Sequence, residues 1–331
     1  MRIGVNPEKI KNEYNVLKKH RIIIVFYIPN VLDDYYKQAF DILDYQLDSL
    51  TKSVSFDTTA ITLVNNNSSI ESTEIYNKYS SFIDKYVVYN ENKGKVYAVL
   101  NEVRSVFEPF VTITDSDVLF YNGWEKAIFS IFKNFPKAGV VTPLPIPFNA
   151  FYFNENLFFN SLWTGIVKYD KIVKDEDIDK YVKGINNIAA TKRNSKYNWK
   201  EKQYFLKKND TIAIVGASHF VATYKTAIFR NIYTFPQVKF KNGYEEQFID
   251  ILSLKKGLYR LSTNGTFAYH MGNTIDDELI SNKVDIYGEM KVVDFHDIDY
   301  KISKREIVFH KVYILKAIRK IKEIFNLIRK K

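Results

Sequence analysis

The segment FVTITDSDVLFYNGW, at residues 110–124, constrains this chain most, because it places two carboxylates at the end of an apolar strand. Val111 and Ile113 have the alternating spacing of a half-buried strand, and Asp115 and Asp117 follow it. The same Asp-x-Asp spacing in the charge run KDEDIDK, at 174–180, favours a solvated face instead. Open α/β sheets bind ligands at the carboxyl ends of their strands. We therefore expect Asp115 and Asp117 to mark a metal and nucleotide site.

Strand-like and helix-like segments alternate along the chain before this point. Buried strands are expected at 21–29, 60–64, 86–89 and 110–114, and amphipathic helices at 8–20, 33–50 and 95–107. Such alternation predicts an α/β fold with a mainly parallel, Rossmann-like sheet flanked by helices. Beyond residue 147 an aromatic stretch and a charged stretch interrupt the pattern, which predicts an insertion at 150–210. Apolar strands return at 211–224.

Composition limits the classes of protein to which the chain can belong. It has 331 residues, 46% of them hydrophobic, which is enough for a packed core, and no cysteine, so a thiolate metal site is excluded. The start of the chain lacks the features of a signal peptide, and no apolar run of roughly 18 residues occurs, so we expect a cytoplasmic protein.

The positive charge is concentrated at the C-terminal end. Residues 311–331 contain eight Lys or Arg and one Glu, which is +7 of the formal +10 and leaves +3 for the rest. A nearly neutral body argues against a nucleic-acid partner. The segment 303–331 has an apolar helical stripe with basic residues elsewhere, which favours a helix on the inner face of a membrane over one packed on its own domain.

The order of the motifs resembles that of nucleotide-sugar glycosyltransferases with the GT-A fold, in particular glycosyltransferase family 2, over about residues 21–273. The segments that carry the resemblance are YIPN (27–30), LVNNNSS (63–69), NENKGKVYAVLNEV (90–103), TITDSDVLFYNGW (112–124), GYEEQFIDILSLKKG (243–257) and TFAYHMGN (266–273). The resemblance implies a GT-A domain at 21–302, with a variable acceptor-side insertion at 150–210, between an N-terminal helical extension at 1–20 and the C-terminal helix.

The resemblance also implies roles for individual residues. Asp117 and His270 would hold a divalent metal, Mn²⁺ or Mg²⁺, and Glu246 would be the catalytic base, with Glu245 beside it. The donor would contact Pro29, Asn30, Asn65, Asn92, Lys93, Asp115 and Ser116. Asn65 stands where the family usually has aspartate, and Glu246 where aspartate is common. By residue type alone, His219 and Trp163 are candidates for contact with the acceptor, the alternatives being a core histidine and an aromatic side chain of the core or a lid.

The implied chemistry is the transfer of a sugar from a nucleoside-diphosphate donor, most simply a UDP-sugar, to a hydroxyl of a glycan or lipid-linked acceptor in cell-surface polysaccharide synthesis. A divalent cation would stabilise the charge of the departing diphosphate, and a carboxylate would accept the acceptor's proton if the anomeric configuration is inverted. Three alternatives remain: a retaining enzyme, a nucleotidyltransferase, and a non-catalytic sugar-binding or scaffold protein. Asp294, His296 and Asp297 form a weaker candidate metal cluster.

Overall fold

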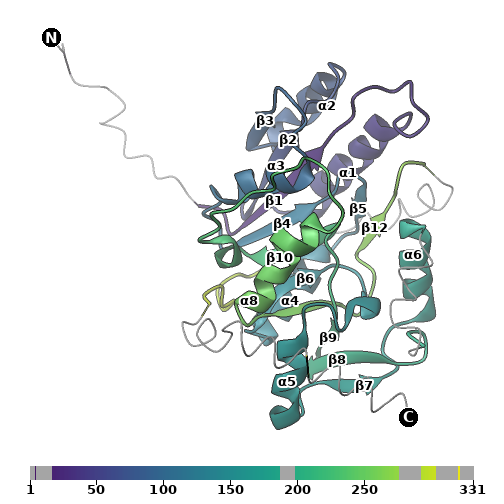
Figure 1. Ribbon diagram of the computed structural model, residues 1–331, viewed down its shortest axis with the longest axis vertical. Helices are drawn as coiled ribbons and strands as arrows, with labels where there is room; N and C mark the ends of the chain where they lie inside the picture. Colours follow the sequence, from purple (N-terminus) through teal and green to yellow (C-terminus); the bar gives the residue numbers. More distant parts are fainter. Residues whose placement is uncertain (1–3, 5–16, 187–197, 276–291, 303–319, 321–331) are drawn as a thin grey trace.

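The described residues of this computed structural model, 4, 17–186, 198–275, 292–302 and 320, contain one ten-stranded sheet (Figure 1). In spatial order its strands are β3 (Lys85–Val88), β2 (Thr59–Asn65), β1 (His20–Phe26), β4 (Phe110–Thr114), β10 (Val221–Lys225), β6 (Ala138–Thr142), β11 (Tyr259–Thr263), β9 (Thr211–Val215), β8 (Gln203–Lys208) and β7 (Lys168–Asp170). The pairings show that β10, β9 and β7 oppose the common direction of the other seven strands. The predicted mainly parallel α/β fold is confirmed.

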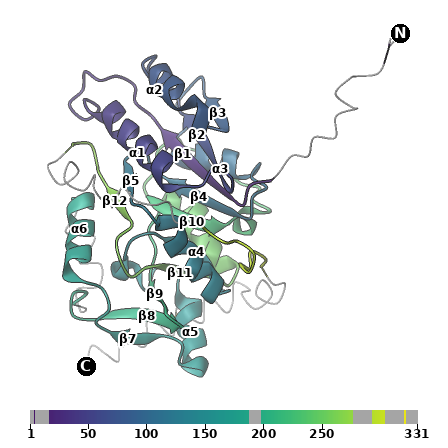
Figure 2. The same ribbon diagram turned by 180° about the vertical axis from the view of Figure 1, so that it is seen from behind.

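Helices cover both faces of the sheet (Figures 1 and 2). They are α1 (Ala39–Ser53), α2 (Ser72–Tyr79), α3 (Lys95–Val103), α4 (Trp124–Asn134), α5 (Glu155–Thr164), α6 (Asp175–Ile185) and α8 (Ile251–Lys255). Alternating residues of β1 serve the two faces: Ile22 and Ile24 belong to the core with α1 and α4, whereas Ile23 and Val25 belong to the core with α3. A strand buried on both faces must be apolar at every position, as β1 nearly is.

A two-stranded sheet brings a distant part of the chain to the end of β4. Strand β5 (Val118–Phe120) begins directly after Asp117 and pairs antiparallel with β12 (Ala268–His270), in a register that sets His270 opposite Val118. The Met271 N–H donates a hydrogen bond to the Asp117 carbonyl (2.8 Å). This pairing therefore fixes residue 270 beside residue 117.

The segment at 150–210 extends the sheet rather than standing apart from it. Its strands β7 and β8 pair with each other, and β8 pairs with β9 at the sheet edge. The aromatic stretch before them is core: Phe148, Phe153 and Leu157 are buried. Phe158 packs edge-on against Tyr204 of β8, with ring centroids 5.2 Å apart, so α5 lies against this edge.

The predicted helix at 33–50 begins later than expected, at Ala39. The Asn30 side-chain oxygen accepts hydrogen bonds from the backbone N–H groups of Leu32 (2.9 Å) and Asp33 (3.0 Å), which makes a turn instead of a helical start. The apolar stretch at 211–224 likewise divides into β9 and β10, which occupy separate places in the sheet. Gly216 lies between them with φ +130°, and a Cβ there would stand 2.1 Å from the Ile146 carbonyl oxygen.

Most of the predicted terminal helices lies outside the described residues. Leu17 to Lys19, at the end of the predicted N-terminal helix, are irregular and lead into β1. Of the predicted helix at 303–331, only Lys320 is described. Among the described helices, none combines the length and the apolar character needed to cross a bilayer.

Candidate active site

Three side chains from distant parts of the sequence converge at the carboxyl end of β4. The Asp115 N–H donates to the carbonyl of Phe220 (2.8 Å), the residue just before β10, which holds the first aspartate at the sheet edge. Asp115, Asp117 and His270 each offer a ligand atom, and these atoms all lie within 4.8 Å of one another. His270 Nε2 is 3.5 Å from Asp117 Oδ2. The β5–β12 pairing thus produces the predicted meeting of Asp117 with His270.

The imidazole of His270 is held in one tautomer by α6. Its Nδ1 lies 2.9 Å from the Gly184 carbonyl oxygen, and because a carbonyl only accepts hydrogen bonds, Nδ1 must carry the proton. Nε2, on the Asp117 side, then has a free lone pair in the neutral ring. Metal-bound histidines are oriented in this way, by a hydrogen bond from the other ring nitrogen.

Asp117 is a carboxylate whose ionisation is opposed by burial. Burial raises its pKa to about 6, against the opposing charge of His270 and with the help of the like charge of Asp115. Its Oδ1 is buried without a hydrogen-bond partner among the described atoms. A divalent cation would satisfy this oxygen and the lone pair of His270 together. Two carboxylates and one imidazole suit Mn²⁺ or Mg²⁺, and the imidazole favours Mn²⁺.

Lys95 is a member of this cluster that the sequence analysis missed. Its ammonium forms an ion pair with Asp115 and lies 3.9 Å from Glu245 Oε1. Burial opposes its charge, but Asp115, Glu245 and Asp117 together outweigh this, and the pKa of Lys95 is raised. A signal was present in the sequence: Lys95 follows the Asn-x-Gly motif and is the first residue of α3, where the helix dipole disfavours a cation. A neighbouring anion compensates for that position.

The acidic motif opens a single π-helical turn, Glu246–Asp250, which leads into α8. Such turns occur frequently at functional sites. Glu245 is half-buried and faces Lys95, whereas Glu246 is exposed. Asp250, at the end of the turn, is fully buried. The described contacts therefore connect Glu245, through Lys95, to the cluster of aspartates and His270, and they leave the Glu246 carboxylate open to solvent.

The model of the family Glycosyl transferase family 2 matches residues 35–233. The chain belongs to this family. The match includes the two aspartates and Lys95, and it ends before the Glu245–Glu246 pair and before His270. No curated protein matches the sequence.

Several solved structures are similar to this family 2 chain. TarS 1-349 from S. aureus is 13% identical with a TM-score of 0.44, over 76% of this chain and 60% of that one. The same protein with UDP-GlcNAc is 13% identical with a TM-score of 0.41, over 80% and 64%. The mannosyltransferase PcManGT from Pyrobaculum calidifontis, in complex with GDP-Man and Mn²⁺, is 13% identical with a TM-score of 0.41, over 76% and 56%. This chain therefore spans less than two thirds of the length of each.

Two of the asparagines assigned to the donor in this family 2 chain have internal partners. Asn65 is buried, where its amide donates to Ser72 Oγ (2.9 Å) and Tyr86 Oη (3.1 Å). Asn92 Oδ1 accepts from the Asn66 side chain and from the Gly94 N–H, both at 2.9 Å. These contacts shape the two loops that border the site, and the donor role of both residues stays a prediction.

The other predicted donor residues lie in the loops that follow β1, β3 and β4. Pro29 and Asn30 follow β1, and Ser116 lies half-buried between the two aspartates. Lys93 forms an ion pair with Glu91. Its backbone N–H donates to Asn66 Oδ1 (2.9 Å), which ties the loop after β3 to the loop after β2.

The two candidate acceptor residues of this family 2 chain lie in different places. His219 precedes Phe220, whose ring packs edge-on against the His270 ring with the centroids 4.9 Å apart. His219 is therefore next in the chain to a residue that contacts the candidate metal site. Trp163 is 78% exposed on α5, which packs on β8. Strand β8 is five positions from β4 in the sheet, or roughly 24 Å at the usual strand spacing. The described structure does not bring Trp163 to the cluster.

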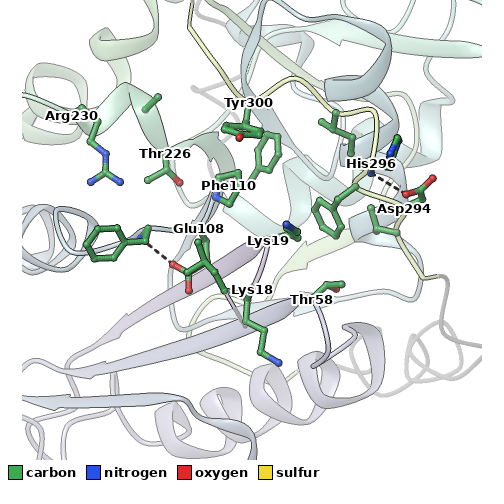
Figure 3. Close-up of a pocket in the computed structure, with 17 residues that line it drawn as sticks. Lys18, Lys19, Thr58, Glu108, Phe110, Thr226, Arg230, Asp294, His296 and Tyr300 are labelled. Atoms are coloured by element: carbon green, nitrogen blue, oxygen red, sulfur yellow. Dashed lines mark hydrogen bonds between the residues drawn. The ribbon is translucent and has the colours of Figure 1, made fainter. Parts of the chain in front are cut away.

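A separate pocket of about 860 Å³ lies at the other end of β4 (Figure 3). It is lined by Phe110, where β4 begins, and by Lys18, Thr226 and His296 among others. His296 contacts Asp297 (2.9 Å), but both side chains are mostly exposed. Among the described residues, only Asp115, Asp117 and His270 form a group that could hold a metal. The alternative cluster at 294–297 is therefore not supported by the geometry.

Proposed function

We propose that this family 2 chain transfers a sugar from a nucleoside-diphosphate donor to a hydroxyl of a glycan or lipid-linked acceptor, with the help of a divalent cation. The observation that carries the proposal is the convergence of Asp115, Asp117 and His270 at the end of β4, with one carboxylate oxygen unpartnered and the imidazole held in the tautomer that a metal requires. Ligand sites in open α/β sheets lie at this edge.

Each residue of the cluster then has a definite task. Asp117 and His270 would hold the cation, which when bound neutralises charge on the departing diphosphate. Lys95 is the described cation closest to Asp115 and can contact an anionic donor once its ion pair opens. These groups favour the transition state because they are held in place before the reaction starts.

The proton of the acceptor requires a carboxylate on the other side of the sugar. We assign it to Glu246, because its side chain is exposed one residue beyond Glu245, which faces the cluster through Lys95. General-base assistance of this kind accelerates a reaction by about 10² to 10⁴. Attack from this side inverts the anomeric configuration, and NMR of the product anomer distinguishes inversion from retention.

Titration calorimetry with UDP, GDP, UDP-GlcNAc and GDP-mannose, each with and without Mn²⁺, tests the donor site. The unaltered protein should bind one of these ligands in a metal-dependent way. Asp117→Asn should weaken that binding by at least about tenfold, because the site loses a negative charge close to the cation. Asp297→Asn, at the exposed carboxylate beside the other pocket, is the matched control and should bind normally. Absence of metal-dependent binding in the unaltered protein would favour the scaffold alternative.

The basic segment 311–331 suggests where in the cell the protein acts. We propose that it holds the enzyme on an anionic membrane surface facing the cytoplasm, where it would act on acceptors for surface polysaccharide. The support is the sequence alone, with a charge of +7 in 21 residues around an apolar helical stripe.

A further inference from the structure

A fully buried ion pair lies beneath the acidic motif. Asp250, in the π-helical turn, and Arg260, in β11, both have no exposed side-chain surface, and Arg260 Nη2 is 2.9 Å from Asp250 Oδ1. Tyr152 donates its hydroxyl hydrogen to Asp250 Oδ2 (3.1 Å). Burial acts to raise the pKa of Asp250, but the charge of Arg260, together with hydrogen bonds from His219 and Tyr152, holds that pKa below its usual range. Asp250 is therefore an anion with fixed partners.

The same carboxylate contacts one exposed side chain, His219. His219 Nδ1 lies 3.5 Å from Asp250 Oδ2, and 45% of the His219 side chain is exposed. An ionised carboxylate only accepts hydrogen bonds, so a proton belongs on Nδ1, and in the neutral ring Nε2 then has the lone pair. The result is an oriented acceptor nitrogen on an open imidazole.

The loop that carries His219 is fixed at several points. The Ser218 N–H donates to Thr142 Oγ1 (3.0 Å), and the Asn149 amide donates to the Ala217 carbonyl (3.1 Å). Close packing at Gly216 leaves no room for a side chain. An imidazole held on such a loop keeps its position without a ligand, as preorganised binding requires.

His219 lies between the candidate metal site and the π-helical turn that carries Glu246, the proposed base. On one side, the Phe220 carbonyl accepts from the Asp115 N–H, and the Phe220 ring contacts His270. On the other side, Asp250 is in the same π-helical turn as Glu246. A molecule that presents a hydroxyl to Glu246 would thus meet His219.

We infer that His219 binds the acceptor by accepting a hydrogen bond at Nε2 from a second, non-reacting hydroxyl of a sugar or other polyol. Asp250 is a positioning residue that sets the tautomer of His219, and Arg260 and Tyr152 keep Asp250 ionised and in place. This inference rests on the proposed function, because it assigns the reacting hydroxyl to Glu246. It narrows the acceptor class to compounds with at least two hydroxyl groups, one for each of the two side chains.

Nitrogen-15 NMR of the histidine side chains tests the arrangement before any acceptor is known. His219 is assigned by the loss of its signals in His219→Gln and should show the proton on Nδ1; the opposite tautomer would overturn the inference. Asp250→Asn should disturb this tautomer. If that variant does not fold, Tyr152→Phe, which removes only one hydroxyl from Asp250, should shift the His219 signals.

Acceptor binding is tested with 4-nitrophenyl hexopyranosides in the presence of Mg²⁺ and the nucleoside diphosphate selected by calorimetry. Mg²⁺ replaces Mn²⁺ because it does not broaden NMR signals. At least one glycoside should shift the His219 signals, and the inference is wrong if none does while the diphosphate binds. A lack of diphosphate binding would instead contradict the proposed function.

Kinetics with the glycoside that binds separate acceptor recognition from proton transfer. His219→Ala should raise the acceptor KM about tenfold, which corresponds to one hydrogen bond, with little change in kcat. His219→Gln, which keeps an acceptor atom, should recover part of the loss, and His296→Ala is the control for an exposed histidine elsewhere. A large fall in kcat at unchanged KM would overturn the inference by making His219 the proton acceptor.

Discussion

Asp117 holds its proton more tightly in the folded protein than an aspartate does in an unfolded chain. Its pKa is about 6, because burial outweighs the neighbouring positive charges, whereas an unperturbed aspartate has a pKa of about 3.9. The stabilisation that protonated Asp117 gives is complete below about pH 4 and is lost as the pH rises through 6. At neutral pH the ionised carboxylate without a metal therefore destabilises the fold.

Asp117→Asn should relieve this penalty. In the presence of EDTA at pH 7.5, we expect the variant to be more stable than the unaltered protein by roughly 1–3 kcal/mol, and the difference should vanish near pH 4. Urea unfolding at the two pH values measures it. Equal or lower stability of the variant at pH 7.5 would show that folding does not raise the pKa of Asp117.

Lys95 should have opposite effects on the two charged ligands of the site. Its ammonium repels a metal cation near Asp115 and attracts a diphosphate, so Lys95→Met should bind Mn²⁺ alone about tenfold more tightly and a nucleoside diphosphate about tenfold more weakly. Calorimetry with each ligand separately gives both values. Lys133→Met, on α4 and paired with Asp297 away from the cluster, should change neither by much. Changes of the same sign for both ligands would exclude this role.

At the level of elements, α6 determines the position of His270. A Cβ at Gly184 would lie 2.7 Å from the His270 carbonyl oxygen, so Gly184→Ala must push the helix and β12 apart and break the bond to Nδ1. Loss of such an orienting bond lowers metal affinity by about 10- to 100-fold. Electron paramagnetic resonance of free Mn²⁺ measures the affinity.

The control for this prediction is Gly265→Ala, since a Cβ there would meet only the Phe267 ring at an ordinary 3.8 Å. If Gly184→Ala caused no clash, the alanine would stabilise helix α6 relative to glycine. A more stable Gly184→Ala protein with normal affinity for Mn²⁺ would therefore show that α6 does not set the imidazole.

The elements were predictable from the sequence where one local pattern decides them. The predicted strand at 110–114 has the bounds of β4, because alternation ends where the aspartates begin. The charge run at 174–180 is only partly a solvated face: Asp177 accepts from the Thr266 N–H (3.1 Å), and Ile178 is buried. Its partner lies almost 90 positions later in the chain, so no local pattern indicated the contact. Lys95 was missed for the same reason, since its meaning depends on Asp115 and Glu245.

At the level of the whole molecule, the order of the sheet could not be predicted from the strands themselves. Strand β10 inserts antiparallel between β4 and β6, and β11 returns beside β6 from more than 100 positions later. Apolar strands of similar composition can take any of these places. The convergence of Asp117 with His270 was predicted only through the resemblance to family 2, which supplied the missing long-range order.

The basic C-terminal segment is expected to act on the whole molecule, because it would attach the protein to a membrane surface. The protein that includes residues 311–331 should sediment with vesicles that contain phosphatidylserine. The double substitution Lys330→Glu and Lys331→Glu should weaken this by roughly 30-fold or more, at about 1 kcal/mol for each basic residue. Lys207→Glu with Lys208→Glu, on exposed positions of β8, makes the same charge change elsewhere and should have little effect. If both double variants lost vesicle binding equally, the binding would depend on the net charge of the protein and not on the C-terminal segment.

The pairing of β5 with β12 has a consequence for the protein during its synthesis. Strands β1 to β4 are complete once residue 114 has left the ribosome, but the imidazole that faces Asp117 is not made until residue 270. Since domains fold as the chain emerges, the nascent N-terminal half exposes its aspartates before their nitrogen partner exists. A chain released before residue 270 would therefore lack the nitrogen ligand of the proposed metal site.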